Sequence, residues 1–435
     1  MGLDERTNAA RLANSGLTRR SFLDLGARGL AAASLAPLWL DGAVAQALGR
    51  SERPPFLAVI FLRGAADGLH LVPPTGDRNY ARARASLALE KSLPFATGFG
   101  LHPRLEALQP LVEAGHLAAI HACGSPRVNR SHFEAQDLVE AGEGDSPRLH
   151  SGWLARGLRR ERESNPFASV ALTSMRPLSL AGSGSFALAD AGDFGLPGAS
   201  DEARRRLALD YGSEPDRDLS RSGTLALEAL AEFESKVARN FREHSFREHS
   251  FGERNFGERR GGPRHRRRGR RGGELTHRVS ELLSLEAAGL PIDTAFLESD
   301  GWDTHQNQGT EKGQMANHIA DLGTAIADLA AGLEGRREWQ VFVHTEFGRT
   351  VAPNGSRGSD HGHGSVALVA GSRVRGGVYG DWPGLRERDL SEGRDLKVTS
   401  DYRSVAWEVL KGHLGATPPP DTFPGFRPQA LGFGV

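Results

Sequence analysis

Residues 340–350 read QVFVHTEFGRT, an apolar run that ends at the carboxylate of Glu346. A short, continuous apolar run is typical of a strand buried on both faces, as in a parallel sheet covered by helices. A buried carboxylate is costly unless it meets a cation, a hydrogen-bond donor or a metal. The residues that the fold brings to the end of this strand therefore bear on both the architecture and the chemistry.

The same pattern recurs outward along the chain. Apolar runs predict further strands at residues 56–62, 117–123, 170–174 and 295–299. A helix is predicted to begin near Ser131, and a second to include residues 319–333, where Ile and Leu repeat at helical spacing. This alternation predicts an α/β fold over residues 52–435, with a central, mostly parallel sheet flanked by helices.

Composition excludes some classes of protein. The chain has 435 residues, of which 38% are hydrophobic and 25% charged, as in ordinary globular proteins. Lys plus Arg and Asp plus Glu both total 54, so the whole chain lacks the basic excess of a nucleic-acid-binding protein, and we expect no specific nucleic-acid partner. Cys123 is the single cysteine, which excludes an intramolecular disulfide.

The first 47 residues resemble a twin-arginine export signal. Arg19 and Arg20 precede a moderately apolar stretch at 25–40, and small residues suited to signal peptidase follow at 43–47. The apolar stretch is short for a membrane-spanning helix. We expect a folded protein exported by the twin-arginine machinery to the periplasm or the medium, without a transmembrane anchor after cleavage. The alternative is a basic amphipathic helix of a cytosolic protein.

Residues 241–273 break the α/β pattern. They begin with FREHSFREHSFGERNFGERR, which repeats a five-residue unit, and eight arginines lie between Arg259 and Arg271. Segments dominated by Gly, Arg and Ser cannot bury enough apolar surface to fold, so a disordered insertion within the domain is predicted. The two interpretations are a tolerated low-complexity expansion and an electrostatic tether to an anionic polymer or lipid.

Four polar clusters lie near the ends of predicted strands, where open α/β sheets place their ligands. They comprise Asp67, Ser131 with His132, Asp303 with His305, and Glu346 with Asp360, His361 and His363. Carboxylates and imidazoles from separate strands suit a divalent ion such as zinc, manganese or calcium. Because a helix N-terminus stabilises negative charge, Ser131 is a candidate nucleophile or anion-binding residue.

Each cluster also has a purely structural interpretation. The alternatives are a turn at Asp67, an N-cap at Ser131 with a capping box to Glu134, a packed core histidine at His132 and an ion pair of Glu346 with Arg349. The sequences WDTH and HGH are more specific, because residues i and i+2 project to the same side of an extended segment. They predict that Asp303 faces one site with His305, and His361 with His363.

Several motifs together resemble one family. They are FLRGAADGLHLV, NRSHFEAQD, GWDTHQNQG, TEFGRTVAPNGSRGSDHGHGSVALVAG, VRGGVYGDWPGL and SDYRSV, which extend from about Phe56 to Leu414. In this order they resemble the exported family catalogued as domain of unknown function 1501, which is similar to alkaline phosphatases and sulfatases. The resemblance implies their α/β sandwich, and the arginine-rich segment lies outside it.

The resemblance also implies roles for individual residues. Asp67, Asp303 and His305 match metal ligands of the superfamily, Glu346 takes the place of a ligand Asp, and His361 or His363 completes the site. Ser131 matches the nucleophile at the start of a helix. Phe347 stands where a second-site histidine is found, so a two-metal site requires His132 or Asp360 as a substitute. Arg63 or Arg349 can bind the anionic group of a substrate.

These implications lead to three functional hypotheses. The first is an exported metal-dependent hydrolase of phosphate or sulfate esters, with an anionic ester or polymer as substrate. The second is a catalytically degenerate binding protein on the same fold, which is favoured by Phe347 and by the absence of a sulfatase-type Cys-x-Pro-x-Arg motif. The third, a metal-dependent mutase or transferase, uses the same residues.

Overall fold

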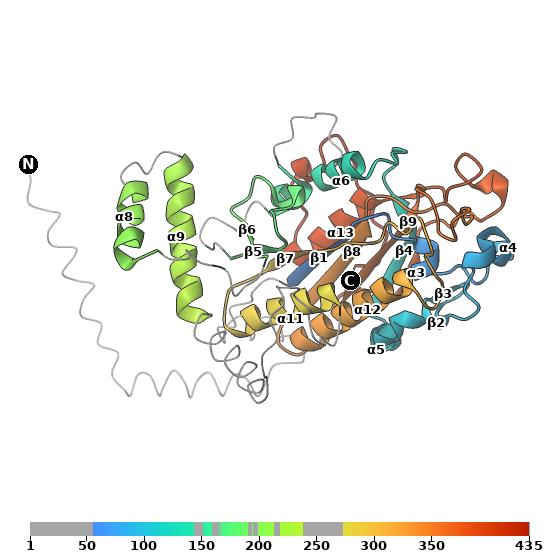
Figure 1. Cartoon of the computed structure of the whole chain (residues 1–435), viewed down its shortest axis with the longest axis horizontal. Coiled ribbons are helices and arrows are strands. Elements are labelled where there is room, and N and C mark those ends of the chain that lie inside the picture. Colours follow the sequence, from blue (N-terminus) through green and yellow to red (C-terminus); the bar gives the residue numbers. More distant parts are fainter. Residues whose placement is uncertain are drawn as a thin grey trace, which may run out of the picture. The chain divides into compact units, whose positions relative to one another are not determined.

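The apolar runs form the middle of one large sheet (Figure 1). In this computed structural model the order of its strands is β10-β4-β9-β8-β1-β7-β5-β6, and β11 pairs with β4. The strands are β1 (Phe56–Leu62), β4 (Leu117–Gly124), β5 (Ser169–Leu172), β6 (Phe186–Ala187), β7 (Thr294–Ser299), β8 (Trp339–Thr345), β9 (Ser365–Gly371), β10 (Gly377–Tyr379) and β11 (Ser400–Asp401). Each strand predicted from the apolar runs is therefore present.

The structure describes most of the chain after the predicted signal. The described residues are 55–142, 151–158, 165, 167–189, 194, 199–212, 218–237 and 273–434. The predicted signal peptide at 1–47 lies outside them, and so does the predicted insertion at 241–273 except for Gly273. Residues Pro54–Val435 form one compact unit.

The sheet is mostly parallel. β1 pairs in parallel with β7 and β8, and the pairs of β5 and β4 with their outer neighbours are parallel as well. β9 is antiparallel to both β4 and β8, so it runs against the direction of the other strands. The predicted α/β class with a mostly parallel sheet is confirmed.

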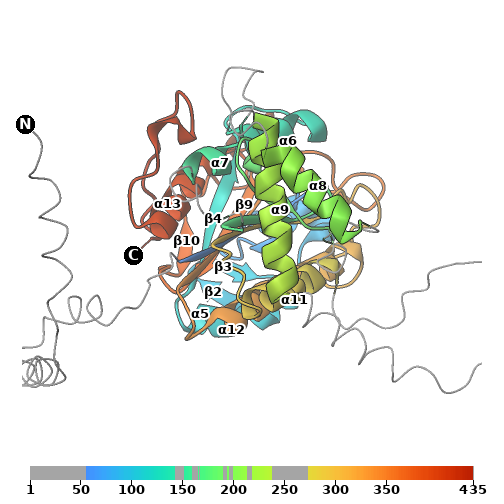
Figure 2. The ribbon, with the colours of Figure 1, turned by 90° about the vertical axis from the view of Figure 1, so that its left-hand side faces the viewer.

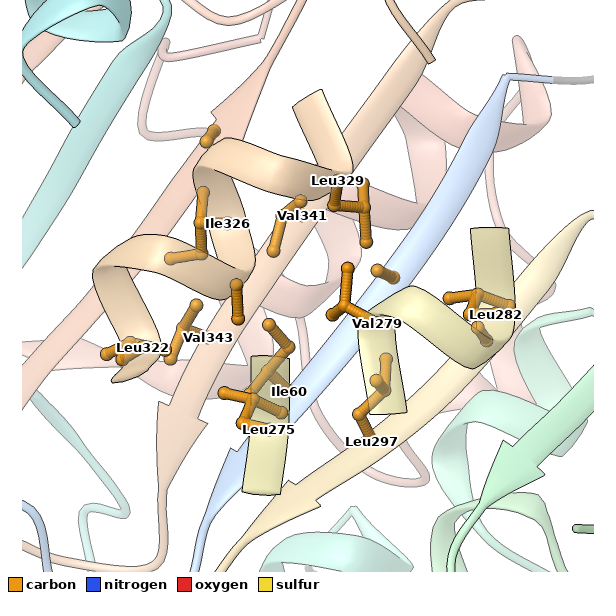
Figure 3. Close-up of a cluster of buried hydrophobic side chains, with 14 of the residues drawn as sticks. Ile60, Leu275, Val279, Leu282, Leu297, Leu322, Ile326, Leu329, Val341 and Val343 are labelled. Atoms are coloured by element: carbon orange, nitrogen blue, oxygen red, sulfur yellow. The ribbon is translucent and has the colours of Figure 1, made fainter. Parts of the chain in front are cut away.

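One face of the sheet is covered by α11 (Glu274–Ala287) and α12 (Gln314–Leu333), which lie on the same side of it (Figure 2). Figure 3 shows the contact layer, in which Ile60 of β1 lies among side chains of both helices. The other labelled members are Leu275, Val279, Leu282, Leu297, Leu322, Ile326, Leu329, Val341 and Val343. Burial of each such Leu or Ile side chain contributes about 1.5–3 kcal/mol.

Alternate residues of β1 supply the opposite face. Leu57, Val59 and Phe61 pack there in a second apolar cluster. The covering helices are α6 (His132–Ala141), α7 (Trp153–Gly157) and α13 (Tyr402–Leu414). Because β1 is buried on both faces, it is continuous in apolar residues, as the sequence pattern requires.

Smaller elements complete the unit. A separate hairpin joins β2 (Leu93–Ala96) to β3 (Phe99–Leu101). The other α-helices among the described residues are α3 (Gly68–Leu71), α4 (Tyr80–Arg84), α5 (Gln109–Glu113), α8 (Asp201–Gly212) and α9 (Asp218–Lys236). In the part of the chain that the structure describes, no helix has both the length and the apolar character needed to cross a membrane.

Candidate metal centre

The predicted polar clusters meet at one edge of the sheet. Leu62, the last residue of β1, is in register with Thr345 of β8 and Ser299 of β7, so three parallel strands end side by side. β9 begins at this same edge because it runs in the opposite direction, and Cys123 near the end of β4 is in register with Ser365 of β9. The topology thus gathers the segments that follow four strands and the one that precedes β9.

Three side chains from these segments form a compact group: His132, Asp303 and His361. The Nε2 atoms of the two histidines lie 3.0 Å apart, and Oδ1 of Asp303 lies 3.4 Å from that of His132 and 3.3 Å from that of His361. Ligand atoms around a tetrahedral ion with bonds of about 2.0–2.1 Å are separated by about 3.3 Å. This His/Asp/His cluster can therefore hold a metal ion.

His305 adds a further imidazole beside the His/Asp/His cluster. Its Nε2 atom lies 2.9 Å from Nε2 of His361 and 3.1 Å from Oδ1 of Asp303. Asp303 and His305 face the same site, as the WDTH motif predicts. An additional ligand can therefore come from within the same loop as Asp303.

Hydrogen bonds at Nδ1 set the tautomer of each imidazole. The Nδ1 atoms lie beside acceptor oxygens: His132 is 2.7 Å from Oε1 of Glu346, His305 is 3.0 Å from Oδ1 of Asp360, and His361 is 2.7 Å from the main-chain oxygen of Arg130. Ionised carboxylates and carbonyls only accept, so each Nδ1 donates a proton. In the neutral rings the lone pairs are then on Nε2, next to a carboxylate oxygen. A cation among them removes the repulsion, as in metal sites whose histidines bind a second oxygen.

Glu346, at the end of β8, supports His132 from behind. Its Oε1 atom also accepts hydrogen bonds from the backbone N–H of Gly64, at 2.9 Å, and from Nε2 of Gln136, at 3.0 Å. Thr345 donates to its other oxygen at 2.8 Å. Burial alone would raise the pKa of Glu346, but these hydrogen bonds, first that of His132, hold it below its usual value. The structure thus places Glu346 behind a histidine of the cluster, in place of the direct ligand role predicted for it.

Arg349 is also placed differently from the prediction. Its guanidinium is fully buried and donates to the main-chain oxygens of Gly64 (2.8 Å), Ala65 (2.9 Å), Trp302 (3.2 Å) and Ser359 (2.9 Å), and to Oδ1 of Asp303. A guanidinium committed to these groups orients Asp303 and is not presented to a substrate anion. The alternative of an ion pair between Glu346 and Arg349 is wrong, because Asp303 is the carboxylate that Arg349 binds.

Arg63 lies in a second network behind the site. It donates to Glu298 at 2.7 Å, to Gln136 at 2.9 Å and to Glu140 at 2.9 Å. Gln136 and Glu140 follow His132 at four-residue intervals on α6, so this face of the helix is attached to the end of β1. The geometry gives Arg63 a role in orienting α6. Its side chain is only 20% exposed, so little of the guanidinium is accessible to the anionic group of a substrate.

Asp67 is the clearest departure from the predicted ligand set. Its Oδ2 atom accepts from Nη2 of Arg84 at 2.5 Å and from Nε2 of Gln308 at 2.7 Å, and Nδ1 of His70 lies 3.4 Å away. Burial acts to raise the pKa of Asp67, but Arg84 and the hydrogen bonds to His70 and Gln308 lower it strongly. Asp67 is therefore an ionised member of a buried ion pair, outside the His/Asp/His cluster.

His361 and His363 do not face the same site. Nε2 of His363 donates to the main-chain oxygen of Ser125 at 2.8 Å, whereas His361 lies in the cluster. Gly362 between them fits closely against Arg349, where a Cβ would be 2.4 Å from the carbonyl carbon, and residues 362–364 lie outside the strands. The expectation from the HGH motif is wrong on this point, and His361 is the member that reaches the site.

The helix that carries His132 begins where the sequence predicts. Ser131 is its exposed N-cap residue, but its side chain makes no capping hydrogen bond, so the capping box with Glu134 does not form. Phe347 stacks on the His132 ring with centroids 4.9 Å apart and lies 5.2 Å from that of His361. An apolar wall therefore closes one side of the cluster.

Protonation states of two cluster members suit metal binding. Burial acts against ionisation of Asp303, but Arg349 and the neighbouring imidazoles outweigh it and lower its pKa. Burial lowers the pKa of His361, which favours the neutral ring. The carboxylate of Glu346 raises the pKa of His132. Metal ligands must be deprotonated, and Asp303 and His361 are so at neutral pH.

Comparison with known proteins gives a match to one family model over part of the chain, and no activity. Residues 264–421 match the model of a family described as Protein of unknown function (DUF1501). The match supports the resemblance seen in the motifs. It includes Asp303, His305 and His361, while His132 lies before it. No curated protein matches the chain.

Sequence reasoning missed the residues that hold the predicted ones in place. Gln136 contacts Glu346, Arg84 binds Asp67, and Gln308 lies between two loops of the site. Gln136 could have been found from its place four residues after His132 on a predicted helix. Arg84 and Gln308 carry no local signal, since their partners are distant in the sequence or belong to irregular loops.

Proposed function

We propose that the protein is an exported metal-dependent hydrolase of phosphate or sulfate esters. The observation that supports this most is that the Nε2 atoms of the histidines converge on Oδ1 of Asp303. The Nδ1 proton of each ring is donated to a carboxylate or carbonyl oxygen on the side away from the cluster. A sandwich of the alkaline phosphatase and sulfatase kind, which the motifs resemble, is proposed as its finer architecture. In such folds the site lies at the carboxyl ends of the strands, as this cluster does.

The ligand set favours some metals over others. Imidazoles with one carboxylate suit zinc, and manganese is the second choice. Calcium prefers six to eight oxygen ligands, which disfavours it here. A bound ion of this kind would supply Lewis acidity and lower the pKa of a bound water or hydroxyl. Candidate ligands are His132, Asp303 and His361, with His305 beside them.

Ser131 is the proposed nucleophile. It is exposed, it directly precedes His132, and its hydroxyl is not engaged as a helix cap. Its oxygen would attack phosphorus or sulfur and displace the alcohol of the ester, and water would then release the phosphate or sulfate from the serine. The N-terminus of α6 beside it favours the negative charge of such groups. Arg349 positions Asp303, and Glu346 positions His132.

A binding protein without turnover is the second candidate function. Phe347 favours it, since its ring covers His132 and approaches His361 on the side where the superfamily resemblance implies a further ligand. In that case the cluster would hold a metal, and a phosphorylated or sulfated polymer would bind without being cleaved. Both candidates require the same metal centre.

Metal analysis tests this proposal. The mature chain, the His361→Ala variant and the His363→Ala variant would be purified after folding with zinc or manganese, and bound metal would be measured by mass spectrometry. His363 is a matched control, because it lies in the same HGH motif outside the cluster. We expect stoichiometric metal in the parent and in His363→Ala, and loss in His361→Ala. No metal in the parent would overturn the proposal.

Activity distinguishes the two candidates. The metal-loaded parent and a Ser131→Ala variant would be assayed on phosphate monoesters, phosphate diesters and sulfate esters. Turnover that falls by at least about 10²-fold in Ser131→Ala supports the hydrolase with a serine nucleophile. Bound metal without turnover on any of these substrates supports the binding protein.

Export is a separate part of the proposal and has its own test. Residues 1–50 would be fused to a folded reporter, with a matched fusion in which Arg19 and Arg20 are replaced by lysine. The proposal expects reporter in the periplasm for the first fusion and retention in the cytoplasm for the second. Equal export of both fusions would exclude a twin-arginine requirement.

A further inference from the structure

Gln308 lies at a junction between the two loops that carry the cluster. Its Oε1 atom accepts hydrogen bonds from Oγ of Ser359 at 2.6 Å and from Oγ1 of Thr304 at 3.1 Å. Its Nε2 atom donates to Oδ2 of Asp67 at 2.7 Å. All four side chains are buried, with exposed fractions of 0% for Gln308 and Ser359.

The orientation of this amide follows from its partners. The Asp67 carboxylate is ionised and can only accept, so it must face the NH₂ group of Gln308. The two hydroxyls then donate to the amide oxygen, which accepts both. Each polar group of the amide therefore has a partner, and a flipped amide would set its oxygen against a carboxylate.

The two hydroxyls belong to the segments that supply metal ligands. Thr304 lies between Asp303 and His305, and Ser359 lies two residues before His361. The segments also touch through the backbone, because the N–H of Ser359 donates to the oxygen of Thr304 at 3.3 Å. The separation of these segments decides how far the Asp303 oxygen lies from the His361 nitrogen.

The amide nitrogen of Gln308 binds a carboxylate that is itself held by a network of buried hydrogen bonds. Asp67 is held by Arg84, which in turn donates to the main-chain oxygens of Thr350 (3.2 Å) and Val351 (3.0 Å). Breaking a buried hydrogen-bond network of this kind is costly, because it leaves polar groups without water or partners. Asp67 and Arg84 therefore have one favoured arrangement, and the hydrogen bonds of Gln308 hold both loops in a fixed position relative to them.

We propose that Gln308 is a positioning residue of the metal centre, whose amide fixes the Asp303 and His361 loops at the separation that a metal ion requires. The inference rests on the proposed metal site and adds the element that shapes it. Residues that orient ligands from behind typically change metal affinity by about 10–100-fold when they are replaced. Gln308 acts on two ligand segments at once, through the hydroxyls of Thr304 and Ser359, which are not among the candidate ligands.

The test uses a side chain of similar length without hydrogen-bonding groups. Gln308→Met, the parent and the matched control Gln314→Met would each be titrated with cobalt(II), with affinity and the visible absorption spectrum as readouts. Gln314 is exposed, and its side chain donates a hydrogen bond to the main-chain oxygen of Gly301 at 3.3 Å. We expect Gln308→Met to bind cobalt at least about tenfold more weakly and with an altered spectrum, and the control to match the parent.

A milder change covers the case in which Gln308→Met does not fold. Ser359→Ala removes the shorter of the two hydroxyl bonds and leaves the glutamine in place. It should weaken cobalt binding and alter the spectrum in the same direction, by a smaller factor. A role confined to stability would lower the urea midpoint of either variant and leave both the cobalt spectrum and the affinity of the folded protein unchanged, which would overturn the inference.

Hydrogen exchange of the metal-free protein separates this inference from the metal proposal. Peptides covering residues 302–308 and 356–361 should exchange faster in Gln308→Met than in the parent, while peptides of β1 and β8 keep their rates. If the parent binds no cobalt, the metal proposal fails, and this comparison alone decides whether Gln308 joins the two loops. Unchanged exchange in both peptides would overturn the inference even where cobalt binds.

Discussion

Nδ1 of His132 lies 2.7 Å from Oε1 of Glu346, across a contact that joins α6 to the end of β8. The carboxylate is fully buried, while the imidazole faces the His/Asp/His cluster. We predict that Glu346→Gln weakens zinc or cobalt binding by about 10–100-fold, because the ring loses the carboxylate that fixes its tautomer and increases its basicity. A competition titration with a chelator of known affinity measures this change.

Asp360 provides the comparison, since it bonds Nδ1 of His305 at 3.0 Å but is 54% exposed. A hydrogen bond open to water contributes less, so Asp360→Asn should weaken metal binding by less than Glu346→Gln does. An equal or larger loss of affinity in Asp360→Asn would contradict the prediction and show that His305 is at least as important a ligand as His132. Comparing the loss of metal affinity in the two variants therefore shows which imidazole contributes more to metal binding.

Arg349 is predicted to be essential for the fold around the site as well as for Asp303. In Arg349→Lys a single ammonium replaces a planar fork of donors, so several of the four main-chain oxygens that Arg349 binds lose their partner. We expect a loss of about 3–5 kcal/mol in the free energy of unfolding, measured with urea in the presence of chelator. The exposed Arg373 pairs with Glu338 at 2.8 Å, and Arg373→Lys should stay within about 0.5 kcal/mol of the parent. A similar small loss in both variants would contradict the prediction.

How far the sequence predicts the fold is clear from β1 and β8. β1 is a seven-residue apolar run, β8 has the apolar residues 341–343 at its centre, and both strands are buried on both faces. The hydrophobic pattern therefore predicts the two strands and a mostly parallel sheet, and their pairing with each other is seen in the structure. The rule that ligands gather at the carboxyl ends of such strands then places Asp303 and Glu346 near each other. Those predictions needed no knowledge of side-chain partners.

The direction that each side chain takes could not be predicted in the same way. Asp67 follows a strand end as Glu346 does, yet it turns to Arg84 and Gln308, the second of which is 241 residues away. His361 and His363 are two residues apart, but residues 362–364 lie outside the strands, so the alternation of a strand does not bring the two side chains to one side. Such choices depend on tertiary packing in irregular loops, where periodicity carries no information.

Gly64, two residues after the end of β1, is predicted to be required for the geometry of the site. Its φ is +112°, and a Cβ there would lie 2.6 Å from the backbone nitrogen of Asp303. Gly289 has a similar φ of +87° with open space around it, so it serves as a matched control for backbone strain alone. Gly289→Ala should cost about 1 kcal/mol of unfolding free energy.

Gly64→Ala should cost clearly more than Gly289→Ala, because the collision with Asp303 adds to the strain, and it should also weaken metal binding. Urea unfolding and cobalt titration of the two variants measure both effects. If the two variants lose the same stability and both keep the parent's metal affinity, the close approach of Gly64 to Asp303 has no role in shaping the site.

His121 predicts how stability changes with pH away from the metal centre. It is buried in β4, where Nε2 donates to the oxygen of Val72 at 2.8 Å and Nδ1 accepts from the N–H of Ala122 at 2.9 Å. Burial lowers the pKa of His121 to about 4, from an ordinary value of 6.5. Between pH 6.5 and pH 4, His121 therefore binds a proton in the unfolded chain and not in the folded chain. Its neutral state costs the folded protein nothing above pH 6.5, and the free energy of unfolding falls as the pH drops from 6.5 toward 4.

Other buried histidines act over the same pH range, since burial also lowers the pKa of His102 to about 4. Replacing His121 with a side chain that does not titrate therefore isolates its own contribution to the free energy of unfolding. Between pH 7 and pH 5 the parent should lose about 2 kcal/mol more unfolding free energy than His121→Gln, because each unit of pKa difference corresponds to about 1.4 kcal/mol. Urea titrations of both proteins at the two pH values, in chelator, give this difference. His121→Gln will be less stable than the parent at pH 7, having lost the fit of the ring between Phe99 and Trp382. The change of unfolding free energy with pH is therefore the quantity to compare, and equal slopes for the two proteins would show that His121 accepts a proton without unfolding.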